Sequence, residues 1–323
     1  MRIQIIQDCI DRLRGKEKLS FPSRRVTDFQ PELYNKKGEK YRLMYLQDTI
    51  SPVYLDGSEK IWWDRYNSGL NQHVYTHQEI LRTRPEGGEK KYAWLIESKA
   101  ILPEDYLLFD KNPGLANQFD LIFTWDVDLL TRHSHARFVP AMYYWYGRAT
   151  CQESPCNGSL SEDAWMRKSK NISMIASEKT MTPIQVMRIE LARYLRRLGM
   201  ADTYGRFDGG SFLTDKSVTL TDYRYTIAIE NDIQPLYFTE KILDCFASMT
   251  VPIYYGATDI GSYFNMDGII RIKPGETDQV EKILAGCCEE DYGARREAVL
   301  DNYRRVMEYS SLSDYIWNHY LAD

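Results

Sequence analysis

The sequence lacks any apolar run long enough to cross a membrane, because a spanning helix needs about 20 mostly apolar residues in succession and no stretch of the 323 residues provides them. It also lacks an apolar leader segment at its start. There the apolar residues Ile3, Ile6, Ile10 and Leu13 recur at helical spacing and charged residues separate them. The sequence therefore predicts a soluble protein that begins with a helical stripe and has no membrane span.

Cysteine is scarce, and neither sign of charge dominates. The six cysteines have neither the density of a secreted disulfide scaffold nor the paired CxxC pattern of a zinc site, so we expect a reducing, cytoplasmic location. The 41 basic and 46 acidic residues give a net charge of −5, with the basic residues spread along the chain, which argues against a nucleic-acid partner. Glycine-rich Gly-x-Gly-x-x-Gly and Walker motifs are missing too, which argues against a dinucleotide oxidoreductase or an NTPase.

What is present is enough apolar sequence for two hydrophobic cores. Hydrophobic residues make up 43% of the chain, and a domain typically has roughly 100 to 200 residues. The polar, turn-rich stretch 147–170 separates the two halves. We therefore place an N-terminal domain at 1–155 and a C-terminal domain at 160–323, with a cleft between them.

Short apolar runs predict an α/β architecture. Buried strands are expected at 91–97 and 119–125 in the first half, and at 172–177, 225–229 and 251–255 in the second. Because a helix is expected between the last two of these strands, they form a β-loop-α-β unit of a doubly wound sheet.

Capping signals fix the helices of the second half. Thr182, Pro183 and Gln185 are typical of a helix start with a capping box, and Gly199 is typical of its end. A second helix is expected at 239–249. The chain after residue 277 also has a helical pattern, and we expect these C-terminal helices to pack back on the first domain.

Polar residues gather where strand 225–229 ends. In open α/β sheets, ligands bind beyond the carboxyl ends of the strands, where helix N-termini offer free N–H groups. The residues in this zone are Glu230, Asn231, Tyr237, Glu240 and Lys241. A nucleotide needs this mixture of carboxylate, amide, ring and cation. The alternative is a purely structural loop, in which Thr239 caps the helix, Glu240 interacts with its positive end and Lys241 is solvated.

Glu97 ends the apolar strand 91–97 and is expected to face the cleft from the first domain. Glutamates are seldom buried unless they are paired or used, so Glu97 is a candidate general base. Partial burial would raise its pKa towards the working pH. The alternative is a strand-end glutamate in solvent.

The residue order from 223 to 256 resembles the signature of the α1,3-fucosyltransferase family. It reads Y-R-Y-x-I-A-I-E-N, then Tyr237-x-T-E-K-I, then V-P-I-Y-Y-G. Upstream, I-A-S at 175–177, the helix with Arg188 and D-x-Y-G-R at 202–206 are similar to that family's strand-Ser, Arg-helix and Tyr/Phe-Gly-Arg succession. W-L-I-E-S (94–98), F-D-L-I-F-T-W-D (119–126) and R-F-V-P (137–140) are weaker equivalents in the same order. The chain looks like a soluble bacterial or viral member.

The resemblance implies a GT-B fold, in which two Rossmann-like domains face each other across a cleft. It implies an inverting, metal-independent enzyme of glycan biosynthesis or protein glycosylation. Such an enzyme transfers fucose from GDP-fucose to an oligosaccharide or glycoconjugate acceptor and requires no cofactor. Arg188 and Lys241 would be the cations on the diphosphate and Glu97 the catalytic base. The remaining donor contacts would be Glu230, Asn231, Tyr237 and Glu240.

Two departures from the family pattern bear on this site. The spacing from Ser177 to Arg188 is longer than the family's, so Gln185, one turn earlier, is a rival occupant of the phosphate site. Leu236 stands where the family often has aspartate or glycine.

Other signals leave alternatives open. Asp126-Val127-Asp128 is a DxD, the motif by which another class of glycosyltransferase holds a divalent metal. The histidines at 73, 77, 133 and 135 have no third ligand at a suitable spacing, and the aromatic clusters 61–63 and 143–145 suit either sugar stacking or core packing. The functional alternatives are an inverting GT-B transferase of another nucleotide sugar and a catalytically idle glycan- or nucleotide-binding protein.

Overall fold

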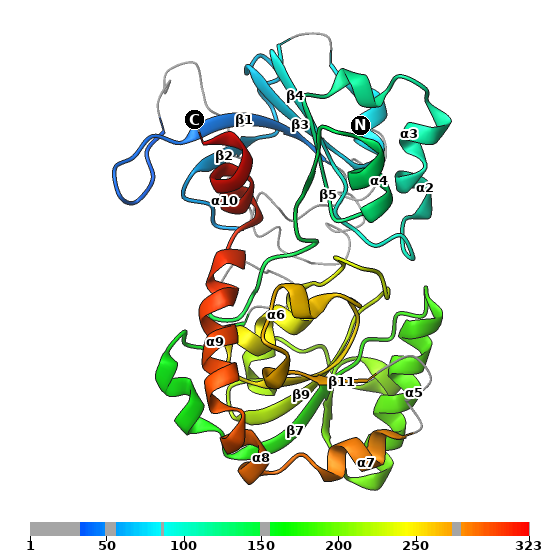
Figure 1. Cartoon of the computed structure of the whole chain (residues 1–323), viewed down its shortest axis with the longest axis vertical. Coiled ribbons are helices and arrows are strands. Elements are labelled where there is room, and N and C mark those ends of the chain that lie inside the picture. Colours follow the sequence, from blue (N-terminus) through cyan, green and yellow to red (C-terminus); the bar gives the residue numbers. More distant parts are fainter. Residues whose placement is uncertain (1–32, 49–55, 85–86, 149–155, 273–278, 323) are drawn as a thin grey trace.

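The computed structural model describes residues 33–48, 56–84, 87–148, 156–272 and 279–322, so the predicted helical stripe at 3–13 lies outside the described residues. Two β-sheets, each with helices packed against it, are stacked along the long axis of the molecule (Figure 1). This is the α/β architecture that the sequence predicts.

The first sheet has six strands in the order β2-β1-β3-β4-β5-β6, and every pair is parallel. The strands are β1 (Arg42–Gln47), β2 (Ile61–Asp64), β3 (Gln72–Thr76), β4 (Lys90–Trp94), β5 (Leu121–Thr124) and β6 (Ala136–Phe138). Their carboxyl ends therefore lie along one edge of the sheet, the edge at which α/β proteins bind ligands. Glu97 follows the end of β4 at this edge.

The second sheet has five strands in the order β11-β10-β9-β7-β8, again all parallel. The strands are β7 (Lys170–Ile175), β8 (Asp202–Tyr204), β9 (Tyr223–Ile229), β10 (Val251–Tyr255) and β11 (Ile270–Arg271). Every residue of β10 is buried, as expected for a parallel strand covered on both faces.

Helices cover both sheets and continue to the C-terminus. The first half contains α2 (Pro103–Tyr106), α3 (Leu108–Lys111) and α4 (Val127–Arg132). The second contains α5 (Pro183–Leu198), α6 (Glu240–Ala247), α7 (Val280–Ala285), α8 (Glu289–Ala294), α9 (Arg296–Val306) and α10 (Leu312–Ile316), which a π-helical turn, Trp317–Leu321, extends. Within the described ranges, none of these helices has both the length and the apolar character that crossing a bilayer requires.

Helix α5 begins and ends where its sequence predicts. The Thr182 hydroxyl accepts the N–H of Gln185 (3.2 Å), and the Gln185 side-chain oxygen accepts the N–H groups of Thr182 (3.3 Å) and Met181 (2.7 Å). This is the predicted capping box. Gly199 ends the helix in the left-handed conformation (φ +64°), which favours glycine.

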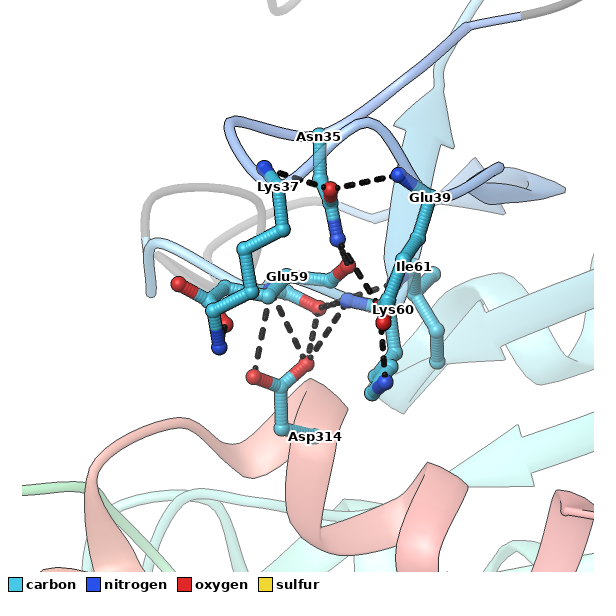
Figure 2. Close-up of polar contacts among 8 residues, drawn as sticks. Asn35, Lys37, Glu39, Glu59, Lys60, Ile61 and Asp314 are labelled. Atoms are coloured by element: carbon cyan, nitrogen blue, oxygen red, sulfur yellow. Dashed lines mark hydrogen bonds and ion pairs between the residues drawn. The ribbon is translucent and has the colours of Figure 1, made fainter.

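The C-terminal helices return from the second sheet to the first, as predicted (Figure 1). At the start of α10, the Asp314 carboxylate accepts the backbone N–H groups of Glu59 and Lys60, each at 3.1 Å (Figure 2). It also accepts the hydroxyl of Ser58. One carboxylate thus accepts hydrogen bonds from three donors of a loop that lies more than two hundred residues earlier in the sequence.

A second set of bonds reinforces this docking. The backbone N–H and hydroxyl of Ser313 both donate to the buried Asp56 carboxylate, at 2.7 and 2.6 Å. The indole of Trp63 in β2 donates to the Ser313 hydroxyl (2.8 Å). We call the contacts of Ser313 and Asp314 with residues 56–63 the α10 latch.

The sequence did not predict every strand. β1, β2, β3 and β6 of the first sheet were not expected from the sequence, and neither were β8 and β11. In the sequence, the stretch 147–170 separates β6 of the first sheet from β7 of the second, which begins at Lys170; the domain boundary within it stays a prediction. The aromatic residues Trp63, Tyr143 and Tyr144 are at most 8% exposed and belong to one hydrophobic cluster, so they pack in the core.

Candidate functional site

Glu230 is the first residue after β9, and its side chain binds the N-cap of α6 on the far side of the loop 231–238. Its side chain is fully buried, and its two carboxylate oxygens accept the N–H and hydroxyl of Thr239, the N-cap of α6, at 2.9 and 2.6 Å. Burial raises the pKa of Glu230, and the nearby Lys241 charge opposes that rise. Glu230 therefore supports the start of α6 from below.

Lys241 and Glu240 form a close ion pair in the first turn of α6. Lys241 Nζ lies 3.1 Å from Glu240 Oε1 and 3.5 Å from Glu230 Oε2, and it also donates to the Thr239 hydroxyl (3.0 Å). Burial alone would raise the pKa of Glu240, but the charges of Lys241 and Lys216 lower it to about 2. Glu240 is thus an ionised carboxylate at neutral pH.

Arg188 of α5 reaches the same place from the side. It is 7% exposed, and its Nη1 donates to the Ile229 carbonyl (3.1 Å), while its buried Nε has no partner among the described residues. Burial lowers the Arg188 pKa, and the charges of Glu230 and Glu240 oppose that effect. An unpaired buried guanidinium N–H is costly, so Arg188 is a buried cation with unused hydrogen-bonding capacity.

The two predicted phosphate cations share one site. The Arg188 charge is near enough to Lys241 to lower the pKa of its ammonium, although burial is the larger cause and the two glutamates raise the pKa overall. Gln185, the rival for the phosphate position, is 2% exposed and its side-chain oxygen is used in the capping box. The arrangement therefore favours Arg188 over Gln185.

Lys216 belongs to this site, and the sequence analysis missed it. Its Nζ lies 3.9 Å from Glu240 Oε1 and 3.7 Å from the centre of the Trp145 ring. The Asp244 carboxylate of α6 accepts the N–H of Trp145 (2.5 Å). Lys216 lies far from residues 230–241 in sequence, on a short turn capped by Asp215, so no local pattern points to it.

Tyr237 connects the two halves of the molecule. Its side chain is 1% exposed and packs in the hydrophobic cluster of the first half, 4.6 Å from the Trp125 ring. Burial and the charges of Glu97, Glu230 and Glu240 raise the Tyr237 pKa well above its usual value. The hydroxyl therefore lies among carboxylates of both halves.

Glu97 lies at the junction of the two halves and is half-buried. Its Oε1 accepts the N–H of Ser98 (2.8 Å), and its backbone carbonyl accepts the Tyr106 hydroxyl. A few residues on, the N–H of Ala100 donates to the Asp232 carboxylate of the second half (3.1 Å). Glu97 is thus held in a loop that docks on the loop after β9.

Asn231 lies between these groups and is half-buried. Its backbone carbonyl accepts the Thr182 hydroxyl (3.5 Å), and no partner for its side-chain amide is found among the described residues. The neighbouring Leu236 has a positive φ of +64°, a conformation that glycine and aspartate adopt more easily than leucine. The backbone here thus suits the residues from which this chain departs, and nothing in the structure explains the leucine.

The side chains of the alternative metal motifs form hydrogen bonds and ion pairs with other residues. Asp126 caps α4 by accepting the Leu129 N–H (2.9 Å), and Lys99 pairs with both Asp126 and Asp128. His77 Nδ1 is hydrogen-bonded to Asp105 (2.6 Å). In the part of the chain that the structure describes, no group of three or more histidine, cysteine, aspartate or glutamate side chains could hold a metal ion.

Comparison with known proteins finds a family match in the second half of the chain. Residues 165–275 match the family model described as glycosyltransferase family 10 (fucosyltransferase) C-term. The match includes Arg188, Lys216 and the whole segment 230–241, and it ends well short of Glu97 on the N-terminal side.

Two curated relatives match parts of the same chain. A protein of Acanthamoeba polyphaga mimivirus named as a fucosyltransferase is 30% identical over 96 residues, which are 29% of this chain and 16% of that protein. An α-(1,3)-fucosyltransferase of Helicobacter pylori is 32% identical over 63 residues, which are 20% of this chain and 13% of that protein. The matched segments thus span a small part of both relatives.

A solved structure extends the likeness to 90% of the chain. The crystal structure of an α1,3-fucosyltransferase with GDP superposes with a TM-score of 0.50 over 90% of this chain and 96% of that chain, at 13% sequence identity. At this identity the likeness concerns the fold alone. The two parallel sheets have the GT-B arrangement, so the predicted fold class is confirmed.

Proposed function

We propose that this protein is an inverting glycosyltransferase that transfers fucose from GDP-fucose to a hydroxyl of a glycan acceptor. The family-model match over residues 165–275 supports the donor class. The observation on which the proposal rests is the contact between the loop that holds Glu97 and the loop after β9. The Ala100 N–H donates to the Asp232 carboxylate (3.1 Å), and the Tyr237 ring lies 4.6 Å from the Trp125 ring. This contact holds the candidate base of the first half against the half that carries Arg188 and Lys241.

In the proposed reaction, the Glu97 carboxylate takes the proton of the acceptor hydroxyl. The hydroxyl oxygen forms a bond to the anomeric carbon of fucose from the face opposite the nucleotide, and the bond from that carbon to the β-phosphate oxygen breaks. GDP leaves with an extra negative charge. The Arg188 guanidinium and the Lys241 ammonium neutralise this charge, which stabilises the transition state.

Glu240 and Asn231 have the donor roles that suit their chemistry. Glu240 stays ionised at any working pH because its pKa is about 2, so its carboxylate can accept hydrogen bonds from ribose hydroxyls. The Asn231 amide can donate to a phosphate or sugar oxygen. Glu230 and Tyr237 are almost fully buried. They stabilise this arrangement through the hydrogen bonds of Glu230 to Thr239 and the packing of Tyr237 against Trp125.

The test is Glu97→Gln, which keeps the shape of the side chain and removes the base. We expect kcat to fall by roughly 10²- to 10⁴-fold, while calorimetry gives an unchanged Kd for GDP-fucose. Glu104→Gln is the control, because Glu104 is an exposed glutamate of the same half that forms only a surface ion pair with Lys111. Full transfer by Glu97→Gln would remove Glu97 from the mechanism.

A thermal-shift screen of nucleotide sugars decides between donors. A ligand present at 100 times its Kd stabilises the folded state by about 2.7 kcal/mol, so the true donor should raise Tm most. A larger shift with another nucleotide sugar would favour a different transferase of this fold. Binding of GDP-fucose without transfer to any acceptor would favour an idle binding protein.

A further inference from the structure

One lysine of the second half lies close to two carboxylates of α6. Lys216 Nζ is 3.9 Å from Glu240 Oε1. Burial raises the pKa of Asp244 to about 6, and the charge of Lys216 opposes that rise. Because residues four apart lie on the same face of a helix, Glu240 and Asp244 place their carboxylates on one face of α6, and Lys216 interacts with both.

An aromatic ring also contacts this ammonium. Lys216 Nζ lies 3.7 Å from the centre of the Trp145 ring, a distance at which the negative face of the ring attracts a cation. The Lys216 side chain is only 16% exposed, so little water screens its charge, and its interactions are stronger than those of a lysine on an open surface. Lys216 is therefore a partly desolvated cation with defined neighbours.

Trp145 belongs to the segment that connects the two sheets. It follows β6 of the first sheet and precedes β7 of the second, and it lies outside the stretch 165–275 that matches the family model. The N–H groups of Trp145 and Tyr146 both donate to the Asp244 carboxylate, at 2.5 and 2.8 Å. The connecting segment is thus fixed to the face of α6 with which Lys216 interacts.

Glu240 depends on its cations because it is buried. Burial raises its pKa, and the charges of Lys241 and Lys216 lower it to about 2. Lys241 is the next residue of α6 and lies 3.1 Å from the carboxylate, whereas Lys216 approaches from a separate turn, Lys216–Thr219. A binding side chain keeps the geometry that its ligand needs when neighbouring groups fix its rotamer. Two cations from two elements fix this carboxylate more firmly than one does.

We propose that Lys216 is a positioning residue of the donor site, which holds the Glu240 carboxylate in place for the hydroxyls of the donor while Trp145 holds the Lys216 ammonium. The inference rests on the proposed function, because Lys216 acts through the donor contact assigned to Glu240. It adds that donor affinity depends on a residue of the segment between the two sheets.

The experiment is a double-mutant cycle on the full chain, with calorimetry of GDP-fucose binding as the measurement. Its members are Lys216→Met, Glu240→Gln and the variant with both changes. Lys216→Met keeps the length of the side chain and removes its charge, and Lys216→Arg keeps the charge. Lys170→Met is the matched control, because Lys170 is an exposed lysine of β7 that also lies over an aromatic ring, that of Tyr223, at 5.2 Å.

We expect Lys216→Met and Glu240→Gln each to weaken GDP-fucose binding by about tenfold, as the loss of an interaction with a charged group does. In the double variant, Lys216→Met should weaken binding by less than about twofold beyond Glu240→Gln, because no carboxylate is left to position. Lys216→Arg should restore most of the affinity. The donor KM of Lys216→Met should rise while kcat stays unchanged.

Trp145 gives a second, independent variant. Trp145→Leu removes the ring face, so we expect GDP-fucose to bind about threefold more weakly, as the loss of a partly exposed cation–π contact predicts. Trp145→Phe keeps a ring face and should bind more tightly than Trp145→Leu. In the Lys216→Met background, Trp145→Leu should have no further effect on the Kd. Thermal unfolding of every variant verifies that it is folded.

Two outcomes separate this inference from the proposed function. If the wild type binds GDP-fucose and the effects of Lys216→Met and Glu240→Gln multiply, or Lys216→Met binds no worse than the control Lys170→Met, the inference is wrong and the proposed function stands. If GDP-fucose does not bind the folded wild type, the proposed function is wrong, and the role of Lys216 fails with it.

Discussion

At the scale of single residues, the start of α6 is surrounded by coupled charges. Lys216, Lys241 and Arg188 lie near Glu230 and Glu240, and every one of these side chains is close enough to another to affect a pKa. Arg188 is the most deeply buried of the three cations, and its Nε has no hydrogen-bond partner among the described residues.

The buried position of Arg188 gives a prediction for Arg188→Met. We expect GDP-fucose to bind at least about tenfold more weakly, since a charge-assisted hydrogen bond contributes about 1.5–3 kcal/mol. We also expect Tm to stay the same or rise, because a buried guanidinium with an unpaired Nε is costly to the folded state. Calorimetry and thermal unfolding measure the two effects.

Arg193→Met is the control for that change, because Arg193 is on the same helix but is exposed and pairs with Asp208. It should leave donor binding unaltered. A lower Tm with normal donor affinity in Arg188→Met would show that Arg188 is a structural residue.

At the scale of elements, the start of α5 positions Arg188 two turns further on. Thr182→Ala removes the hydroxyl half of the capping box, so we expect the free energy of unfolding to fall by about 1 kcal/mol. Thr182→Ser, which keeps the hydroxyl, should unfold close to the wild type in a urea titration. Equal stability of the two variants would mean that the cap does not hold this helix.

The α10 latch gives a second prediction at this scale. Asp314→Ala leaves the N–H groups of Glu59 and Lys60 and the Ser58 hydroxyl without their acceptor, so we expect a loss of about 1–3 kcal/mol. Asp314→Asn, which keeps one acceptor oxygen, should lose less. Limited proteolysis should cut Asp314→Ala faster near α10.

The surface change Glu308→Gln provides the comparison for the latch, since Glu308 is on the same C-terminal segment and contacts only the exposed His319. If Asp314→Ala and Glu308→Gln unfold alike, the latch contributes nothing to stability.

Several of these elements could be predicted from the sequence because their signals are local. The cap at Thr182 and the stop at Gly199 define α5, and the apolar runs of β9 and β10 define two central strands. β3 was not predicted because its residues Gln72–Thr76 include polar side chains. His73 is nevertheless fully buried, and its Nδ1 forms a hydrogen bond with the Tyr75 hydroxyl at 2.8 Å.

At the scale of the whole molecule, buried carboxylates set the pH dependence of stability. Burial raises the pKa of Asp48, Asp56 and Asp244 to about 6 each. The native state then binds protons more tightly than the unfolded state between about pH 4 and 6. Stability should therefore increase as pH falls from 7 to 5.

Other groups act outside that window. Burial lowers the Lys168 pKa to about 7. Above pH 7 the native state therefore binds fewer protons at Lys168 than the unfolded state does, and this group increases stability as pH rises there. Glu240, with a pKa of about 2, contributes stability that is present above its unfolded pKa and is lost as pH falls towards 2. We therefore expect Tm to be highest near pH 5 and to drop below about pH 4.

Scanning calorimetry at pH 7, 5 and 3.5 measures this profile. Asp56→Asn keeps an acceptor for Ser313 but cannot titrate, so its rise in Tm between pH 7 and 5 should be smaller than that of the wild type. A steady fall in Tm from pH 7 to 5 would show that the pKa values of these carboxyls are not raised in the native state.

The sequence by itself determined the α/β class, the main elements of the second half and the residue types at the end of β9, because caps, apolar periodicity and strand-end chemistry are local properties. Only the tertiary structure decided which of these residues meet. Lys216 forms an ion pair with Glu240, and the Tyr237 ring packs beside Trp125. The Asp314 carboxylate accepts a hydrogen bond from the loop before β2 of the first sheet. Such contacts join distant segments, and their energy comes from burial and from pairing charges out of water, which no local stretch of sequence encodes.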